Sequence, residues 1–332
     1  VLDPIHYYGA LSGDYLIAGT GANFPTLKAA LDSIELAGVS GPVRLLINTS
    51  TLTETSVLQL IGPIMGSSST NTITIKPNTG FTPQVNIQVP TTTSATYGLL
   101  MYGVSNIIID GSNTTGGTTR DMTWSGGTNS STTQNLIQFF IQPWNGLTDG
   151  NPLNVQNITI KNLNIRGGYN SALTSALSDY GVLVQGSNTG NAPYAIASDI
   201  TVTNNMISQV AQGVRVIVPS PDLYINRAKR LTITNNIIGP GAIGTDSICN
   251  AGMVFQGVDS LTVTGNDIQR IYSGSGTAVI YGVQVYSGTS NLKFAQNKVH
   301  NMMLRSTAGQ VFGLWESSAW PANDQNYWYN NM

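Results

Sequence analysis

Charged side chains are scarce in this chain. Asp, Glu, Lys and Arg make up 9% of its 332 residues, whereas ordinary domains contain about 25%. The formal net charge is −2, so the sequence contains no basic patch of the kind that attracts nucleic acid. We therefore expect no nucleic-acid partner.

Cysteine, histidine and long apolar runs are scarce as well. Cys249 is the single cysteine and cannot form an internal disulfide, and the two histidines, His6 and His300, are far apart. A metal site or a Ser–His catalytic pair is therefore not expected. No apolar run approaches the roughly 20 residues of a membrane helix. The sequence predicts no cofactor, no metal and no transmembrane segment.

Thr, Asn, Ser and Gly take the place of the charged residues. This composition is typical of exported surfaces, and the chain begins with Val and without a recognisable signal peptide. We therefore predict an extracellular or cell-surface location for a mature or trimmed chain.

An eight-residue pattern recurs along the chain. In the last four copies the first residues are 30 or 31 positions apart. Positions one and three are apolar and positions two and four are mainly Thr, which is the alternation of a half-buried strand. Repeats of this length stack and bury their apolar faces against their neighbours. The pattern predicts one side of a parallel β-solenoid. The copies are Ile158–Ile165, Ile200–Ile207, Leu231–Ile238, Leu261–Ile268 and Leu292–Val299.

Asparagine occupies position six of the last four copies, as Asn205, Asn236, Asn266 and Asn297. Asn tolerates the left-handed backbone conformation, so we expect these residues to bend the strand. Their amides can also bond to the equivalent residue one coil away. We predict a structural ladder through these four residues.

A second strand pattern, led by glycine, lies between the copies. We interpret each glycine as a tight corner before a strand. The wide gap after the first of them predicts a further strand through Leu136–Phe139. The glycines are Gly98, Gly181, Gly213, Gly252, Gly282 and Gly313.

The remaining segments complete a single all-β domain over residues 1–332. Residues 1–22 are interpreted as irregular, 23–38 as a helix cap, 42–318 as coils and 319–332 as a C-terminal tail. The amphipathic helix is expected over Pro25–Ala37, with Asn23 or Thr26 at its start and Gly38 at its end. Residues 111–135, rich in Gly, Ser and Thr, are interpreted as a loop.

Three N-terminal segments, Phe24–Leu31, Gly38–Val43 and Ser69–Pro77, resemble secreted pectin-lyase-like proteins of the Bacteroidota, and residues 97–318 resemble the parallel β-helix of that superfamily. The repeats and this resemblance together predict a right-handed parallel β-helix of roughly nine coils with the helix at its N-terminal end. The resemblance is specific for fold and not for activity, because the superfamily includes lyases, hydrolases, esterases, tailspikes and adhesins. The expected core contains Ile158, Ile160, Val182, Val202, Val214, Ile233, Met253, Val263, Val283, Phe294 and Leu314.

The outward positions of the two strand patterns differ. On the Thr-rich strands they are mostly Thr, which is a solvated surface, and Asp199 and Arg230 can pair between successive coils. On the glycine-led strands they include aromatic, amide and one guanidinium side chain. Such a face is either covered by loops or is a contact site for glycan or protein. The candidate ligand-binding residues are Arg215, Gln256, Gln284, Tyr286 and Trp315.

Catalytic residues are not recognisable on the same face. Glycosidic hydrolysis usually needs two facing carboxylates, and no outward column of Asp or Glu exists there. The sequence therefore favours a structural or adhesive surface protein, filament-forming or glycan-binding. The alternative is a carbohydrate-active enzyme, a polysaccharide lyase or glycoside hydrolase acting on acidic polysaccharide, which the fold resemblance alone supports.

Self-association is the partner interaction that the ends of the chain predict, either lateral or head to tail. We expect the aromatic tail to fold back over the end of a lone molecule. In an assembly, that end should meet Tyr7, Tyr8 and Tyr15 in residues 1–22 of the next subunit. Light scattering should then find oligomers of the full chain and monomers of a chain lacking residues 1–22. Two strictly monomeric chains would contradict this arrangement.

Overall fold

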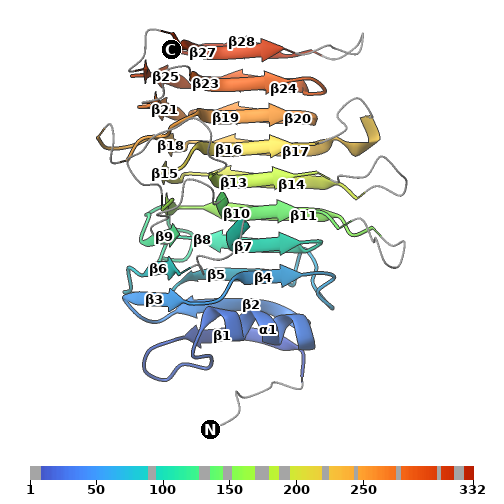
Figure 1. Ribbon diagram of the computed structural model, residues 1–332. Helices are drawn as coiled ribbons and strands as arrows, with labels where there is room; N and C mark the ends of the chain where they lie inside the picture. The colour runs from blue at the N-terminus through green and yellow to red at the C-terminus, as the bar shows by residue number, and fades with distance from the viewer. Residues whose placement is uncertain are drawn as a thin grey trace.

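The protein is a stack of parallel strands. The computed structural model describes residues 9–88, 95–126, 135–144, 152–168, 179–186, 195–218, 224–242, 246–273, 278–304, 308–317 and 325–332. Within them, strands lie across one long axis and follow one another from the N-terminal to the C-terminal end (Figure 1). They form three large sheets with parallel pairing, an arrangement consistent with a parallel β-solenoid.

Each large sheet takes one strand from each turn of the chain. The threonine sheet contains β1 (Leu11–Ile17), β2 (Val39–Ile47), β5 (Ile73–Pro77), β8 (Ser105–Asp110), β11 (Val155–Lys161), β14 (Ala197–Thr203), β17 (Ala228–Thr234), β20 (Val258–Thr264), β24 (Ser290–Ala295) and β28 (Tyr327–Tyr329). The glycine sheet contains β4 (Leu58–Ile61), β7 (Ala95–Tyr102), β10 (Asn135–Gln142), β13 (Tyr180–Gln185), β16 (Gln212–Ile217), β19 (Ala251–Gln256), β23 (Val279–Tyr286) and β27 (Gln310–Ser317).

The third large sheet is built from shorter strands and is called the short-strand sheet. It contains β3 (Thr51–Glu54), β6 (Gln84–Ile87), β9 (Met122–Gly126), β12 (Leu163–Arg166), β15 (Met206–Ser208), β18 (Ile237–Ile238), β21 (Asp267–Gln269) and β25 (Lys298–His300). The remaining elements are the strand pair β22 (Tyr272–Ser273) and β26 (Met303–Leu304), the helix α1 (Leu27–Ala37) and a 3₁₀ turn, η1 (Tyr224–Asn226).

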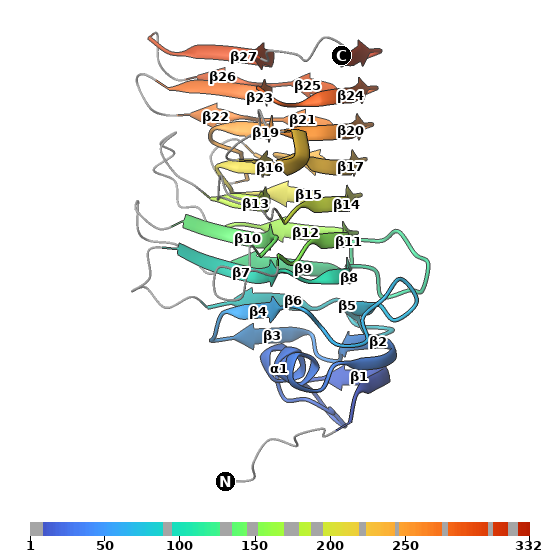
Figure 2. The same ribbon diagram turned by 90° about the vertical axis from the view of Figure 1, so that its right-hand side faces the viewer.

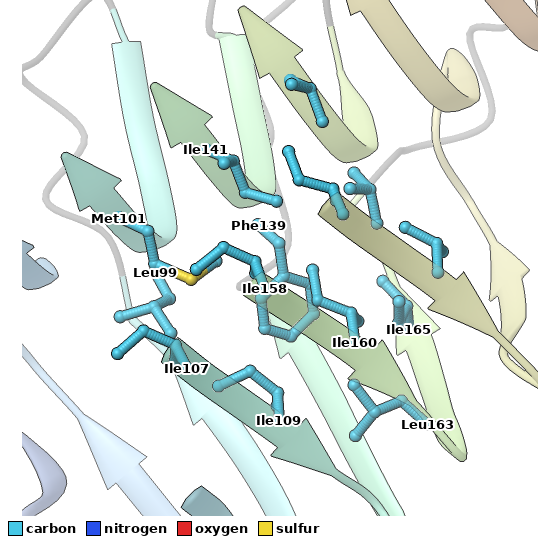
Figure 3. Close-up of a cluster of buried hydrophobic side chains, with 14 of the residues drawn as sticks. Leu99, Met101, Ile107, Ile109, Phe139, Ile141, Ile158, Ile160, Leu163 and Ile165 are labelled. Atoms are coloured by element: carbon cyan, nitrogen blue, oxygen red, sulfur yellow. The ribbon is translucent and has the colours of Figure 1, made fainter. Parts of the chain in front are cut away.

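The core lies between the three sheets. Side chains from β7, β8, β10, β11 and β12 meet there (Figure 3). The core residues expected from alternation are confirmed with one exception, since all the others are at most 2% exposed. Leu314 is 43% exposed, so that prediction was wrong. Its strand, β27, pairs with β23 on one side and ends the glycine sheet on the other, which leaves one edge of Leu314 uncovered.

The asparagine ladder is a chain of amide hydrogen bonds between successive strands. Asn236 is fully buried, and its Nδ2 donates to Asn266 Oδ1 at 3.0 Å. Asn205 and Asn266 donate in the same way to Asn236 and Asn297, at 3.0 and 2.9 Å. Asn331 continues the series by accepting from the amide of Asn297 at 3.3 Å. The four predicted residues therefore form one continuous buried column.

The bend, however, lies one residue earlier than the sequence predicted. Left-handed φ values occur at position five of the pattern, at Asn204 (53°), Asn235 (56°), Gly265 (68°) and Gln296 (57°). Two adjacent asparagines tolerate this conformation equally well, so the pattern did not distinguish them. The side chain at position six points inward and forms the ladder hydrogen bonds, while the left-handed residue at position five bends the backbone.

The glycines of the glycine sheet lie within strands rather than at corners. Except at Gly313, where an added Cβ would meet nothing within 4 Å, they are needed because the glycine sheet and the short-strand sheet approach closely. A Cβ on Gly252 would lie 2.3 Å from Ile268 Cγ2, and one on Gly213 would lie 2.7 Å from Ile238 Cγ2. The predicted strand through Leu136–Phe139 is confirmed as part of β10.

Two segments interpreted as irregular contain strands. Leu11–Ile17 is β1, and it pairs in parallel with β2 although Gly13 and Asp14 favour strands poorly. Met122–Gly126, inside the expected loop, is β9, and its Trp124 is fully buried. In both cases pairing with a neighbouring strand decides the conformation, and sequence alternation over such short segments is a weak signal.

The helix begins later than expected, at Leu27, with Thr26 as its N-cap. Thr26 Oγ1 accepts from Ala29 N at 3.1 Å, and Gly38 ends the helix with φ 70°. The helix lies at the N-terminal end of the stack, beside β1 and β2 (Figure 2), and buries Leu27, Ala30, Leu31 and Ile34. Pro25 is outside the helix.

Two glutamates connect the helix to the sheets. Glu54 of β3 accepts from Leu27 N at 2.6 Å, and Glu35 of the helix accepts from Ile61 N of β4 at 2.6 Å. Burial raises the pKa of Glu54 above its usual value, and the backbone hydrogen bonds from Leu27 and Lys28 oppose that rise. Both carboxylates thus satisfy backbone donors at a helix start and a strand edge.

The described part of the C-terminal tail extends the stack. Tyr327–Tyr329 forms β28, which pairs in parallel with β24, and Tyr327 is 55% exposed. The expected capping is confirmed in part for residues 325–332: their backbone joins the threonine sheet, and Trp328 packs on the core residue Phe294 with ring centroids 4.7 Å apart. Trp320, Tyr7 and Tyr8 lie outside the described residues. Tyr15 packs against Phe24 with ring centroids 5.7 Å apart, and the head-to-tail contact stays a prediction.

Candidate binding face on the glycine sheet

The five candidate ligand-binding residues lie on four adjacent strands of the glycine sheet. Arg215 pairs in register with Val254, Val254 with Gln284, and Gln284 with Trp315. These positions form one row across β16, β19, β23 and β27. Gln256 and Tyr286 belong to the next outward row, two residues further along β19 and β23. The structure therefore gathers the five residues on one face.

Aromatic rings dominate the C-terminal part of this face. Trp315 meets Tyr286 edge-on at 5.2 Å and Tyr281 at 5.8 Å, and Tyr281 stacks on Phe312 at 5.5 Å with 12° between the rings. All four side chains are half-buried. We call Tyr281, Tyr286, Phe312 and Trp315 the aromatic strip.

Polar groups border the aromatic strip. Gln284 is only 5% exposed and hydrogen-bonds the Tyr286 side chain. Burial raises the pKa of the Tyr286 hydroxyl, and the nearby Arg215 charge and the Gln284 hydrogen bond oppose that rise. Gln284 therefore positions Tyr286 and offers little surface of its own.

Arg215 is held by its neighbours on the sheet. Its Nη1 donates to Tyr180 Oη at 3.0 Å and to Gln212 Oε1 at 3.4 Å, and its guanidinium lies 5.3 Å from the Tyr180 ring centroid. A guanidinium fixed in this way on a half-buried surface loses little mobility on binding.

The N-terminal part of the face is different. Ile137, Phe140, Tyr180 and Leu183 form a buried apolar cluster, although they point away from the solenoid interior. These four side chains are therefore out of reach of a ligand, whereas Tyr97, Leu100 and Ile217 beside them are half-buried.

Sequence reasoning missed Tyr281 and Phe312. Each immediately precedes a glycine, and strict alternation would place both inside. The structure breaks the alternation at that point, because Gly282 and Val283 both face the interior. The sequence did contain a hint, because a tyrosine often precedes the glycine, as at Tyr97, Tyr180 and Tyr281. Whether that tyrosine side chain points inward or outward depends on the close approach of the sheets.

One carboxylate occurs in the four strands of this face. Glu316 of β27 pairs in register with the inward-facing Val285 and accepts from Asn326 Nδ2 at 2.9 Å.

In the part of the chain that the structure describes, no group of three or more His, Cys, Asp or Glu side chains could hold a metal ion. No helix within the described ranges is both long and apolar enough to cross a membrane.

The threonine sheet carries the predicted ion pair. Arg230 and Asp199 meet at 2.6 Å, and their side chains are 59% and 33% exposed. Solvent screens a pair this exposed, so it contributes little to stability. We interpret it as a link between the paired strands β14 and β17.

Comparisons of the chain with protein-family models, curated proteins and solved structures found no match.

Proposed function

We propose that this chain is a structural or adhesive β-solenoid protein of the cell exterior that binds glycan through the aromatic strip. The observation that carries this proposal is the gathering of Tyr281, Tyr286, Phe312 and Trp315 on one half-buried face. Aromatic faces provide apolar area at fixed geometry, and bordering amide and guanidinium groups provide the hydrogen bonds that a sugar needs.

The proposal includes the architecture that the resemblance implies. We propose a right-handed parallel β-helix of the pectin-lyase-like type, of roughly nine coils, whose N-terminal end α1 closes. The contacts of Glu54 and Glu35 with backbone donors support the closing role. An experimental density map gives the hand and the number of coils directly, and a left-handed solenoid would end this part of the proposal.

The exterior location is supported by the low charged fraction of 9%. Antibody detection after cell fractionation should find the protein in the medium or on the surface. Detection only inside the cell would contradict it.

The aromatic strip should be required for glycan binding. Replacing Trp315 and Tyr286 together with Ala should weaken binding on a glycan array at least about tenfold, since a central aromatic contact in an interface often contributes more than 1.4 kcal/mol. Tyr329→Ala is the matched control, because Tyr329 is 44% exposed but lies on the threonine sheet.

Three outcomes would count against this function. Binding that survives the double substitution would remove the aromatic strip as the site. Failure of the unaltered chain to bind any glycan would remove the adhesive role. Release of shortened or unsaturated sugar products during incubation would favour the carbohydrate-active enzyme instead.

A further inference from the structure

A groove of about 530 Å³ lies on a different face, over the short-strand sheet. Its lining includes Thr123 of β9, Asn164 and Arg166 of β12, Met206 and Ser208 of β15, and Asp246 beyond β18. In register, Asn164 pairs with Thr123 and Met206 on either side. Three strands about 4.8 Å apart span about 10 Å, which is comparable with one or two sugar rings.

Arg166 is oriented toward this groove. Its Nε donates to Gln209 Oε1 at 2.9 Å, which fixes the plane of the guanidinium. Its side chain is 50% exposed. An oriented guanidinium with exposed N–H groups suits a planar or tetrahedral oxyanion.

Asp246 faces Arg166 from the other side of the groove, with a loose contact. The Arg166 Nη2 to Asp246 Oδ1 distance is 3.6 Å, longer than a hydrogen bond. By contrast, Arg230 and Asp199 meet at 2.6 Å. Asp246 packs against Gly241, where an added Cβ would lie 2.5 Å from Asp246 Oδ2. The carboxylate therefore balances the Arg166 charge without full contact.

The rest of the groove is amphipathic. Thr123 and Ser208 bring hydroxyl groups, and Asn164 brings an amide whose Nδ2 donates to Arg120 O at 3.1 Å, with its Oδ1 as a further acceptor. Met206 brings an apolar, adaptable surface. Hydroxyl groups beside an apolar patch match the two kinds of surface on a sugar ring.

We infer that this groove binds a sugar unit bearing an oxyanion, a carboxylate or a sulfate ester, whose anionic group takes the place of Asp246 beside Arg166. The hydroxyl and amide groups of the groove then contact the sugar, and its apolar side rests on Met206. This site is separate from the aromatic strip and does not depend on glycan binding there.

Calorimetric titration of the full chain tests the inference with three probes of equal length: a uronate oligomer, a sulfated oligomer and a neutral oligomer. We expect one or both anionic probes to bind and the neutral probe to bind at least about tenfold more weakly. Arg166→Gln should weaken anionic binding at least about tenfold. Arg44→Gln, an exposed arginine paired with Asp14 elsewhere, should leave it unchanged.

Asp246→Asn separates ligand binding from a merely structural role. Removal of the competing carboxylate should tighten anionic binding several-fold, whereas loss of a structural ion pair would weaken or not affect it. Thermal melting of each variant checks that the fold is retained. Equal affinity of Arg166→Gln and the unaltered chain, unchanged or weaker binding by folded Asp246→Asn, or no anionic binding at all would overturn the inference. Binding that persists in Trp315→Ala/Tyr286→Ala would support a site separate from the aromatic strip.

Discussion

Replacement of Asn236 by Leu is expected to lower the free energy of unfolding by about 3–5 kcal/mol, since each buried polar group without a partner costs about 1–3 kcal/mol. Asn236 Oδ1 accepts from both the backbone N and the Nδ2 of Asn205, at 2.9 and 3.0 Å. Asn236 Nδ2 also donates to Val202 O at 2.9 Å. The substitution removes these three contacts and the hydrogen bond from Asn236 Nδ2 to Asn266 Oδ1 at 3.0 Å, all inside a fully buried column.

Leucine is a suitable replacement because the column already accepts it. Leu163 occupies the equivalent position of an earlier strand, is fully buried, and donates its backbone N to Asn205 Oδ1 at 3.1 Å. The stability lost in Asn236→Leu therefore reflects mainly the missing hydrogen bonds and less the change in side-chain volume. Thr232→Val, on the half-exposed outer face of the adjacent strand, is the control and should stay within about 0.5 kcal/mol.

Urea denaturation of the three proteins measures the difference. An Asn236→Leu chain as stable as the control would mean that the ladder contributes little. Asn236→Asp should also be destabilised, because a carboxylate cannot donate to Val202 O and its charge would be buried.

Replacement of Gly252 by Ala is expected to cost about 3 kcal/mol, the upper part of the usual range for overpacking. The new methyl group would lie 2.3 Å from Ile268 Cγ2 and 2.6 Å from Gly282 O. Ile268 belongs to β21 of the short-strand sheet and Gly282 to β23, the neighbour of β19 in the glycine sheet, so one of these packed strands must shift.

Gly313 provides the matched control in the same column. An added Cβ there meets nothing within 4 Å. Gly313→Ala should be neutral or stabilising by about 0.5 kcal/mol, because alanine restricts the unfolded chain. Thermal unfolding of both variants measures the contrast. Equal destabilisation at the two positions would mean that the column needs glycine for its backbone conformation and not for sheet approach.

The sequence by itself determined the stacked architecture. The spacing of the copies, the alternation of Thr with Ile or Val, and the two columns of Asn and Gly identify parallel strands and most of the core. These features are local and repeated, so each copy reinforces the same interpretation. The helix was recognisable for a similar reason, because Leu27, Leu31 and Ile34 recur at helical spacing.

Which way some side chains point, and which of them are covered by neighbouring residues, depended on the tertiary structure. Alternation placed Tyr281 inside, but close packing of Gly282 against Val299 turns it outward. Alternation also placed Gln284 on an open surface, whereas its neighbours bury it. Leu314 has a core pattern and lacks a covering strand.

The residues that form the two proposed binding surfaces were the hardest to predict from the sequence. Arg166 and Asp246 are 80 positions apart and meet across the groove because β12, β15 and β18 stack in successive turns. The aromatic strip joins side chains of β23 and β27 through the register of their pairing. A repeat pattern determines how strands stack, because each strand repeats the same alternation. Which outward side chains form a site depends on strand register, sheet distance and the segments between strands, and these are set only when the chain is folded.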